Sequence, residues 1–149
     1  MSETLEKLKH YCAYQERCHS EVRTKLLSLK VYGSELENII TALIDEDFLN
    51  EERFAQAYCR GKFYYKQWGR NKIVQSLKLK QVSDYCIRKG LKEIDEIDYK
   101  NTIEAIIEQK KQQLASEKNV YVKKNKIFQY LFRKGYESSL ISSSLDILL

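Results

Sequence analysis

One short pattern of apolar residues occurs three times along the chain, and it limits the fold more than any other feature. Leu26, Leu77 and Leu131 each follow an apolar residue by four positions and precede others by five and by ten. The matching residues are Val22, Val31 and Leu36 in the first copy, Ile73, Val82 and Ile87 in the second, and Ile127, Tyr136 and Ile141 in the third. A spacing of four places side chains on one helix face, and the next apolar residue marks a turn into a second helix. Because so small a unit buries its apolar face poorly, the pattern predicts tandem units whose stacking completes the core.

The rest of the chain favours an all-α fold. It contains no proline and only five glycines, which permits long uninterrupted helices. Apolar periodicity predicts nine helices: about 3–16, then from Ser20, from Ser34, from Glu51, 70–80, from Ser83 to near Gly90, 97–117, 122–134 and 137–148.

Polar residues at the expected helix ends predict how the helices begin and stop. The predicted N-cap residues are Ser20, Ser34, Asn50 and Ser83. Ser34 and Glu37 have the spacing of a capping box, in which each side chain binds a backbone amide at the start of the helix. Gly90 and Gly135 suit the helix ends, where Gly90 is expected to adopt a left-handed conformation.

The composition argues against a membrane protein, a secreted protein and a metal-binding protein. No apolar run approaches the roughly 20 residues of a membrane span, and the polar start of the chain is unlike a signal peptide. The four cysteines show no C-x-x-C spacing, which favours reduced thiols in a cytoplasmic protein. A metal site would have to use His10, Cys12, Cys18 and His19, but their spacings fit no structural zinc pattern, so we expect no metal.

The charge is distributed unevenly. Residues 1–60 carry 8 Lys or Arg and 11 Asp or Glu, whereas residues 61–149 carry 18 and 10. The runs 62–80 and 118–134 each hold six basic residues and no acidic one. A basic half of this kind indicates an anionic partner, such as nucleic acid or an acidic protein surface.

Aromatic residues lie within the first basic run, and two interpretations of them stand. Phe63, Tyr64, Tyr65 and Trp68 would stack on nucleobases if exposed, or fill the core if buried. We favour the core, because Tyr65 continues the helix face of Phe54 and Tyr58.

No constellation of catalytic residues is present in the sequence. Neither histidine pairs with a nucleophile, and the sequence has no Gly-rich phosphate loop and no H-E-x-x-H. The carboxylates at 45–47 and 51–52 lie at expected helix ends, where capping and solvation account for them. The sequence therefore predicts a binding surface rather than an enzyme, with no cofactor.

The segment 43–73 carries a family resemblance. Its Phe-Leu-Asn-Glu-Glu-Arg-Phe-Ala run at 48–55 and its Trp-Gly-Arg-Asn-Lys-Ile run at 68–73 resemble the RecX family of bacterial recombination regulators. Weaker similarities are Ser-Glu-Val-Arg-x-Lys-Leu at 20–26, Ile-x-x-x-Leu at 73–77 and Leu-Phe-Arg-Lys-Gly-Tyr at 131–136. The family usually has glycine at the turn inside each unit. Here only Gly135 keeps it, Lys30 and Gln81 replace it, and Gly33 is an alternative site for the first turn.

The resemblance implies an elongated, curved array of three tandem three-helix modules, at residues 1–49, 50–92 and 93–149. It implies a monomer, active in DNA repair, recombination and the SOS response. Such a protein would bind in the groove of the RecA–single-stranded DNA filament and inhibit filament extension, ATP hydrolysis and strand exchange. The alternative is a helical module that binds DNA or RNA directly, either single- or double-stranded. The candidate partner-binding residues are Lys62, Lys66, Arg70, Lys72, Lys123, Lys124, Lys126, Arg133 and Lys134.

Overall fold

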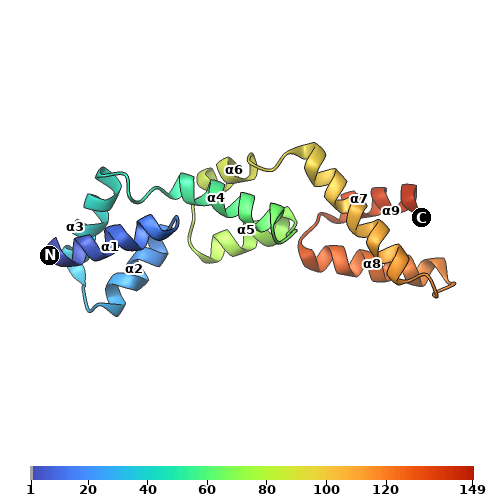
Figure 1. Cartoon of the computed structure of the whole chain (residues 1–149), viewed down its shortest axis with the longest axis horizontal. Helices are drawn as coiled ribbons and strands as arrows, with labels where there is room; N and C mark the ends of the chain where they lie inside the picture. The colour runs from blue at the N-terminus through green and yellow to red at the C-terminus, as the bar shows by residue number, and fades with distance from the viewer. Residues whose placement is uncertain (1) are drawn as a thin grey trace. The chain divides into compact units, whose positions relative to one another are not determined.

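The computed structural model describes residues 2–149 and consists, within them, of nine helices and no strand (Figure 1). The prediction of an all-α protein is confirmed. The helices are α1 (Ser2–Tyr14), α2 (His19–Ser28), α3 (Gly33–Asp45), α4 (Glu51–Tyr64), α5 (Arg70–Leu79), α6 (Asp84–Leu91), α7 (Glu96–Gln113), α8 (Val120–Lys134) and α9 (Ser138–Leu148).

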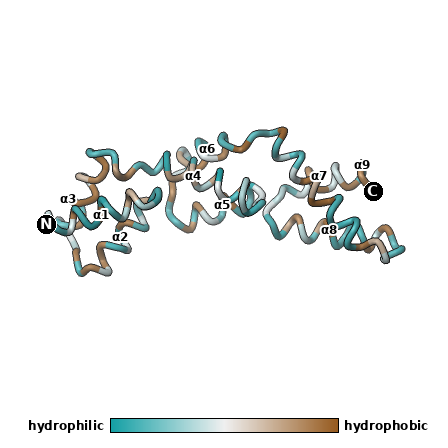
Figure 2. The backbone as a smooth tube through the Cα atoms, in the orientation of Figure 1, coloured by the Kyte–Doolittle hydropathy of each residue, from teal (hydrophilic) through white to brown (hydrophobic). Residues whose placement is uncertain are grey.

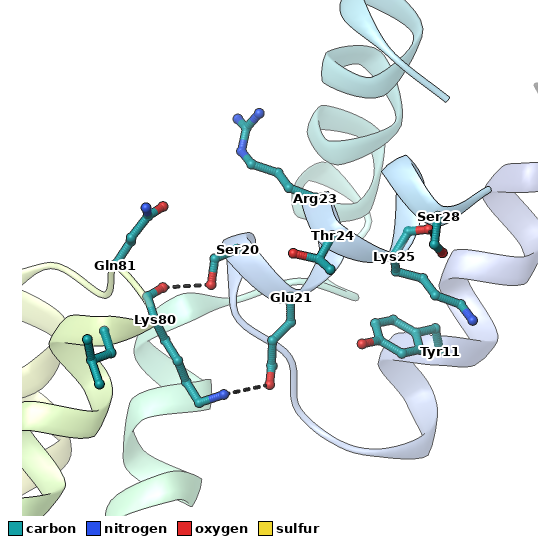
Figure 3. A pocket seen from close by; sticks show the side chains of 10 residues that line it. Tyr11, Ser20, Glu21, Arg23, Thr24, Lys25, Ser28, Lys80 and Gln81 are labelled. Atoms are coloured by element: carbon teal, nitrogen blue, oxygen red, sulfur yellow. Dashed lines mark hydrogen bonds and ion pairs between the residues drawn. The ribbon is translucent and has the colours of Figure 1, made fainter. Parts of the chain in front are cut away.

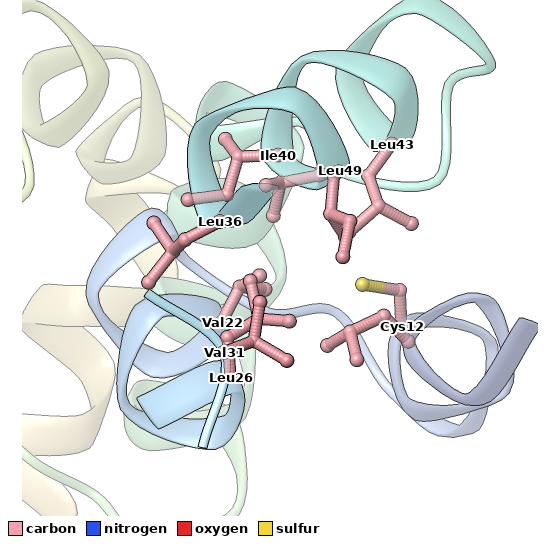
Figure 4. Packing of buried hydrophobic residues seen from close by; sticks show 10 residues of the cluster. Cys12, Val22, Leu26, Val31, Leu36, Ile40, Leu43 and Leu49 are labelled. Carbon is pink, nitrogen blue, oxygen red and sulfur yellow. The ribbon is translucent and has the colours of Figure 1, made fainter. Parts of the chain in front are cut away.

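The helices belong to two compact units, and α4 and α5 each contribute residues to both. Unit 1 comprises Met1–Tyr58 and Ser76–Leu91, and unit 2 comprises Cys59–Gln75 and Lys92–Leu149. In unit 1, α1, α2 and α3 enclose an aliphatic cluster whose members include Leu26, Ile40 and Leu43 (Figure 4). In unit 2, the core includes Phe63, Tyr99 and Tyr136, whose rings pack in series at centroid distances of 5.5 and 5.2 Å.

Apolar residues recur along each helix at intervals instead of forming one continuous apolar segment (Figure 2). This distribution is what amphipathic helices require, because each helix has one face against the core. All twelve apolar positions of the threefold pattern are buried, with exposed fractions of 6% or less.

The turn inside each copy of the pattern has the same geometry. Lys30, Gln81 and Gly135 follow the aligned leucines by four positions and have φ angles of 62°, 64° and 102°. The next residue, Val31, Val82 or Tyr136, donates its N–H to the carbonyl of the aligned leucine at 3.0 to 3.1 Å. A left-handed residue followed by this bond is a Schellman helix end. The turn therefore persists where glycine is absent, and Lys30 itself occupies its left-handed position. Gly33 is left-handed as well, with a φ angle of 58°, but it begins α3 and does not replace Lys30 in the turn.

Glycine at these turns is expected to stabilise the protein. A left-handed conformation costs a non-glycine residue roughly 1–2 kcal/mol, and glycine's extra freedom in the unfolded chain offsets part of this gain. Gln81→Gly should therefore raise the free energy of unfolding by about 0.5–1 kcal/mol, measured by urea denaturation. Lys78→Gly, on the exposed side of α5, should lower it by about the same amount. If Gln81→Gly destabilised the protein as much as Lys78→Gly does, the left-handed conformation of Gln81 would be contradicted.

Helix starts were predicted with mixed success. Asn50 and Ser83 cap α4 and α6 as expected, accepting the N–H groups of Arg53 and Cys86 at 2.9 and 3.2 Å. The predictions at Ser20 and Ser34 were wrong. Cys18 precedes α2, where Glu21 accepts the Cys18 N–H at 3.1 Å, and Tyr32 precedes α3.

Two further predictions near helix ends also differ from the structure. Gly90 is buried inside α6 and does not have a positive φ angle, so it does not end the helix. Glu37, predicted to complete the capping box with Ser34, instead pairs with Arg23 at 2.6 Å.

Candidate binding surface

In unit 2, the segment between α4 and α5 joins the turn between α8 and α9 through main-chain hydrogen bonds. The N–H groups of Gly69 and Asn71 donate to the carbonyls of Lys134 and Gly135, both at 2.8 Å. The Tyr136 hydroxyl donates to the carbonyl of Gln67 at 2.7 Å. We call this arrangement the Gly69 junction. It assigns a structural role to the Trp-Gly-Arg-Asn run, because Gly69 and Asn71 of that run supply the main-chain donors.

Close backbone contact makes glycine necessary at this junction. A Cβ atom on Gly69 would lie 2.3 Å from the carbonyl carbon of Gly135 and 2.4 Å from the nitrogen of Tyr136. Real side chains essentially never approach backbone so closely, so the two segments touch only because residue 69 has no side chain.

A partly buried polar network lies beside the Gly69 junction. The Tyr99 hydroxyl accepts the Arg70 N–H at 3.0 Å and donates to Glu137. The Arg70 guanidinium lies 3.9 Å from the Tyr99 ring centroid and pairs with Glu137 at 2.9 Å and Glu96 at 2.8 Å. Burial opposes the charge on Arg70, but the hydrogen bonds to the two carboxylates outweigh it and raise its pKa. Arg70 was predicted to face a partner, and the structure places it within this network.

Unit 1 contains a related contact. The Ser20 hydroxyl donates to the Lys80 carbonyl at 2.7 Å, and the Lys80 ammonium pairs with Glu21 at 3.2 Å (Figure 3). In the threefold alignment Ser20 corresponds to Asn71, and Lys80 to Lys134. The start of α2 thus contacts the α5–α6 turn as the start of α5 contacts the α8–α9 turn. A hollow of about 610 Å³ lies beside this contact and is lined also by Tyr11, Thr24 and Lys25.

All nine candidate basic residues lie in unit 2, in two groups. The first group surrounds the Gly69 junction. The ammonium groups of Lys62 and Lys72 lie 4.7 and 4.4 Å from the Trp68 ring, and Lys134 donates to the carbonyl of Lys66 at 3.0 Å. These contacts hold two cations, Lys62 and Lys72, over one indole ring.

The second group lies on α8. Lys123, Lys124 and Lys126 are on its first half, where Lys124 pairs with Asp146 at 3.6 Å, and exposed Arg133 lies one residue before its end. Sequence reasoning missed Lys110 on α7, whose ammonium lies 3.9 Å from the ring of Tyr130 on α8. No run of basic residues marked it, because Glu104 and Glu108 precede it in the chain.

The aromatic residues of the first basic run divide between core and surface. Phe63 is buried, whereas Tyr65 is 88% exposed, so the prediction that Tyr65 belongs to the core was wrong. The buried face at the end of α4 passes through Ala55, Cys59 and Phe63, so the face that Tyr65 shares with Tyr58 points away from the core.

The described part of the chain holds no group of three His, Cys, Asp or Glu side chains suited to a metal ion. Burial raises the pKa values of Cys12 and Cys18, which disfavours the thiolate that a metal would need. None of the helices within residues 2–149 combines the length and the apolarity of a bilayer span.

The fold defines a class of protein: tandem three-helix modules with contacts between helix starts and turns, and with two groups of basic residues in unit 2. Family models support this description. Residues 50–91 match the second three-helix domain of RecX, and residues 98–145 match the third. Together these matches cover more than half of the chain, which therefore belongs to the RecX family.

Similarity to individual proteins points to the same family. The chain is 32% identical over 130 residues to a regulatory protein RecX from Clostridium tetani, and 28% identical over 138 residues to one from Bacillus licheniformis. These matches cover 87% and 91% of this chain but 59% and 51% of the relatives, so the chain spans little more than half their length. The crystal structure of RecX from Lactobacillus salivarius superposes with a TM-score of 0.89 at 26% identity, covering 99% of this chain and 95% of that one.

Proposed function

We propose that this protein binds the filament of RecA recombinase on single-stranded DNA and inhibits filament extension, ATP hydrolysis and strand exchange. Membership of a family of regulatory proteins carries this proposal. The basic face of unit 2 supports it, because a nucleoprotein filament is a polyanion. In this proposal the protein acts as a monomer in the cytoplasm without chemistry of its own, and its modules are residues 1–49, 50–92 and 93–149.

The direct test is the ATPase activity of RecA on single-stranded DNA at increasing concentrations of the protein. We expect hydrolysis and strand exchange to fall together, because both require an extended filament. Unchanged hydrolysis and strand exchange at saturating protein would refute the proposal.

Charge reversal on α8 tests where the filament binds. Lys123→Glu, Lys124→Glu and Lys126→Glu together should raise the concentration for half-inhibition about tenfold, equivalent to about 1.4 kcal/mol. The matched control reverses three exposed lysines elsewhere, Lys7, Lys92 and Lys100. Circular dichroism should show both variants folded. If the two variants inhibit equally, α8 is not the binding surface.

A second candidate function is direct binding of nucleic acid, favoured by exposed rings next to cations. Tyr65 and Tyr121 are 88% and 84% exposed, and they neighbour the two basic groups in sequence. Flat exposed rings beside cations are typical of surfaces that bind single strands. This function predicts affinity without recombinase that falls steeply with salt. A flat salt response would remove it.

A further inference from the structure

A small hollow on the surface of unit 2 gathers positive charge from two helices. Its volume is about 190 Å³, and it lies between the end of α7 and the part of α8 from Lys126 to Arg133. The residues that line it are Lys110, Gln113, Leu114, Lys126, Ile127, Tyr130 and Arg133. Three of these are cationic and none is acidic.

The cations at the hollow are not neutralised by the protein. Within residues 2–149, Lys126 and Arg133 have no ion-pair or hydrogen-bond partner for their charged groups. Lys110 contacts the Tyr130 ring at 3.9 Å and donates to the amide oxygen of Gln113 at 3.2 Å, but it meets no carboxylate. Like charges held around one hollow repel each other, and a bound anion would relieve that repulsion.

The size of the hollow restricts the anion. Sites for drug-sized ligands occupy about 300–1,000 Å³, so a hollow of about 190 Å³ is too small for a whole nucleotide. A single phosphate group, with lysine, arginine and amide donors around it, suits this volume and chemistry.

The surroundings favour a polymer of phosphates. Lys123, Lys126, Tyr130 and Arg133 lie on one face of α8 at spacings of three, four and three residues. At 1.5 Å per residue this stripe is about 15 Å long, enough to follow several backbone groups. The partly exposed ring of Tyr130 lies within this stripe, whereas Tyr121, in the first turn, is on the opposite side of the helix. An aromatic ring within a line of cations fits a single-stranded nucleic acid better than an acidic peptide, which has no bases to stack.

We propose that the hollow between α7 and α8 binds a backbone phosphate of single-stranded nucleic acid, through Lys110, Lys126, Arg133 and Gln113. This inference rests on the proposed function, because the phosphate it assigns is one that the filament's DNA would supply. It adds α7, and Lys110 in particular, to the basic surface.

The test measures binding of a fluorescent oligothymidine to the full chain without recombinase, by anisotropy at several salt concentrations. Each phosphate contact to a single strand contributes about 0.7 to the slope of log affinity against log salt. Because the hollow holds one phosphate, replacing Lys110, Lys126 and Arg133 with glutamine should reduce the slope by about 0.7, a roughly fivefold loss of affinity near 0.1 M salt. The control triple, Lys7→Gln, Lys92→Gln and Lys100→Gln, removes the same charge away from the hollow and should leave the slope within about 0.2.

Single variants separate a site from general attraction. Lys110→Gln should weaken oligothymidine binding about twofold near 0.1 M salt, its share of one phosphate contact, whereas Lys100→Gln, also on α7, should not change it. Equal losses from the two triples, or polyglutamate competing as well as unlabelled oligothymidine, would overturn the assignment. If the hollow variants keep wild-type DNA affinity while the wild-type protein still inhibits RecA, the inference fails and the proposed function stands. If the hollow variants lose DNA affinity as expected but the wild-type protein does not inhibit RecA, the inference stands and the proposed function fails.

Discussion

Replacing Gly69 with alanine should strongly destabilise the protein, because it disrupts the Gly69 junction. The new Cβ would meet backbone atoms of Gly135 and Tyr136 at 2.3 to 2.4 Å, and backbone cannot rotate away as a side chain can. The two segments would have to separate, losing the hydrogen bonds from Gly69 and Asn71. We expect a loss of at least about 3 kcal/mol in the free energy of unfolding, measured by urea denaturation followed at 222 nm.

Gly61 provides the matched control for this change. It lies inside α4, and a Cβ there would meet nothing within 4 Å. Gly61→Ala should therefore stabilise the protein by about 0.5–1 kcal/mol, because alanine favours helix more than glycine does. Comparable stability for the Gly69 and Gly61 variants would show that the two segments do not approach as described.

Arg70→Ala should cost about 2–4 kcal/mol of stability. The change removes the cation from Glu137, whose side chain is only 29% exposed, and uncovers the ring of Tyr99. A partly buried carboxylate left without its partner is strongly destabilising. Arg70→Lys keeps the charge but loses the planar guanidinium that reaches Glu96 and Glu137 together. The stability of this variant should therefore lie between those of the wild type and Arg70→Ala.

Arg60 distinguishes this network from an ordinary surface pair. It pairs with Glu93 at 2.6 Å while its side chain is 49% exposed, so Arg60→Ala should cost at most about 1 kcal/mol. Equal losses at both arginines in urea denaturation would contradict a structural role for Arg70. In the tests of the proposed function, the Arg70 variant and the wild type must be compared at equal folded concentration, because unfolding would otherwise imitate a lost contact.

The sequence predicted the helices and the threefold pattern because both depend on local spacing. An apolar residue four positions before each aligned leucine indicates a buried helix face, and this inference does not depend on which helix packs against it. Asn50 and Ser83 were predicted for the same reason, since a cap needs only the first turn that follows it. Ser20 was misassigned because its hydroxyl donates to the carbonyl of Lys80, sixty residues away, which no local rule anticipates.

The candidate site was less accessible to sequence reasoning. The basic runs pointed to unit 2, but they could not separate Arg70, held by two carboxylates, from Lys66, whose ammonium meets no partner within the described residues. Lys110 reaches the hollow only because α7 packs against α8, so its role depends on tertiary contact. Tyr65 was misplaced because the prediction followed the face of Tyr58, whereas the buried face of α4 runs through Cys59 and Phe63.

The Gly69 junction is made mostly of peptide groups, and this has an evolutionary consequence. Every residue supplies a backbone carbonyl, so most side chains around the junction are free to change over time while its shape stays constant. Lys30 and Gln81, at the corresponding turns of the other two copies, illustrate that freedom. Gly69 and Gly135 do not share it, since a Cβ atom on either would lie within 2.6 Å of the facing backbone. Lineages of this chain should therefore diverge in charge far faster than in architecture, and its surface can adapt to a changing partner without rebuilding the scaffold.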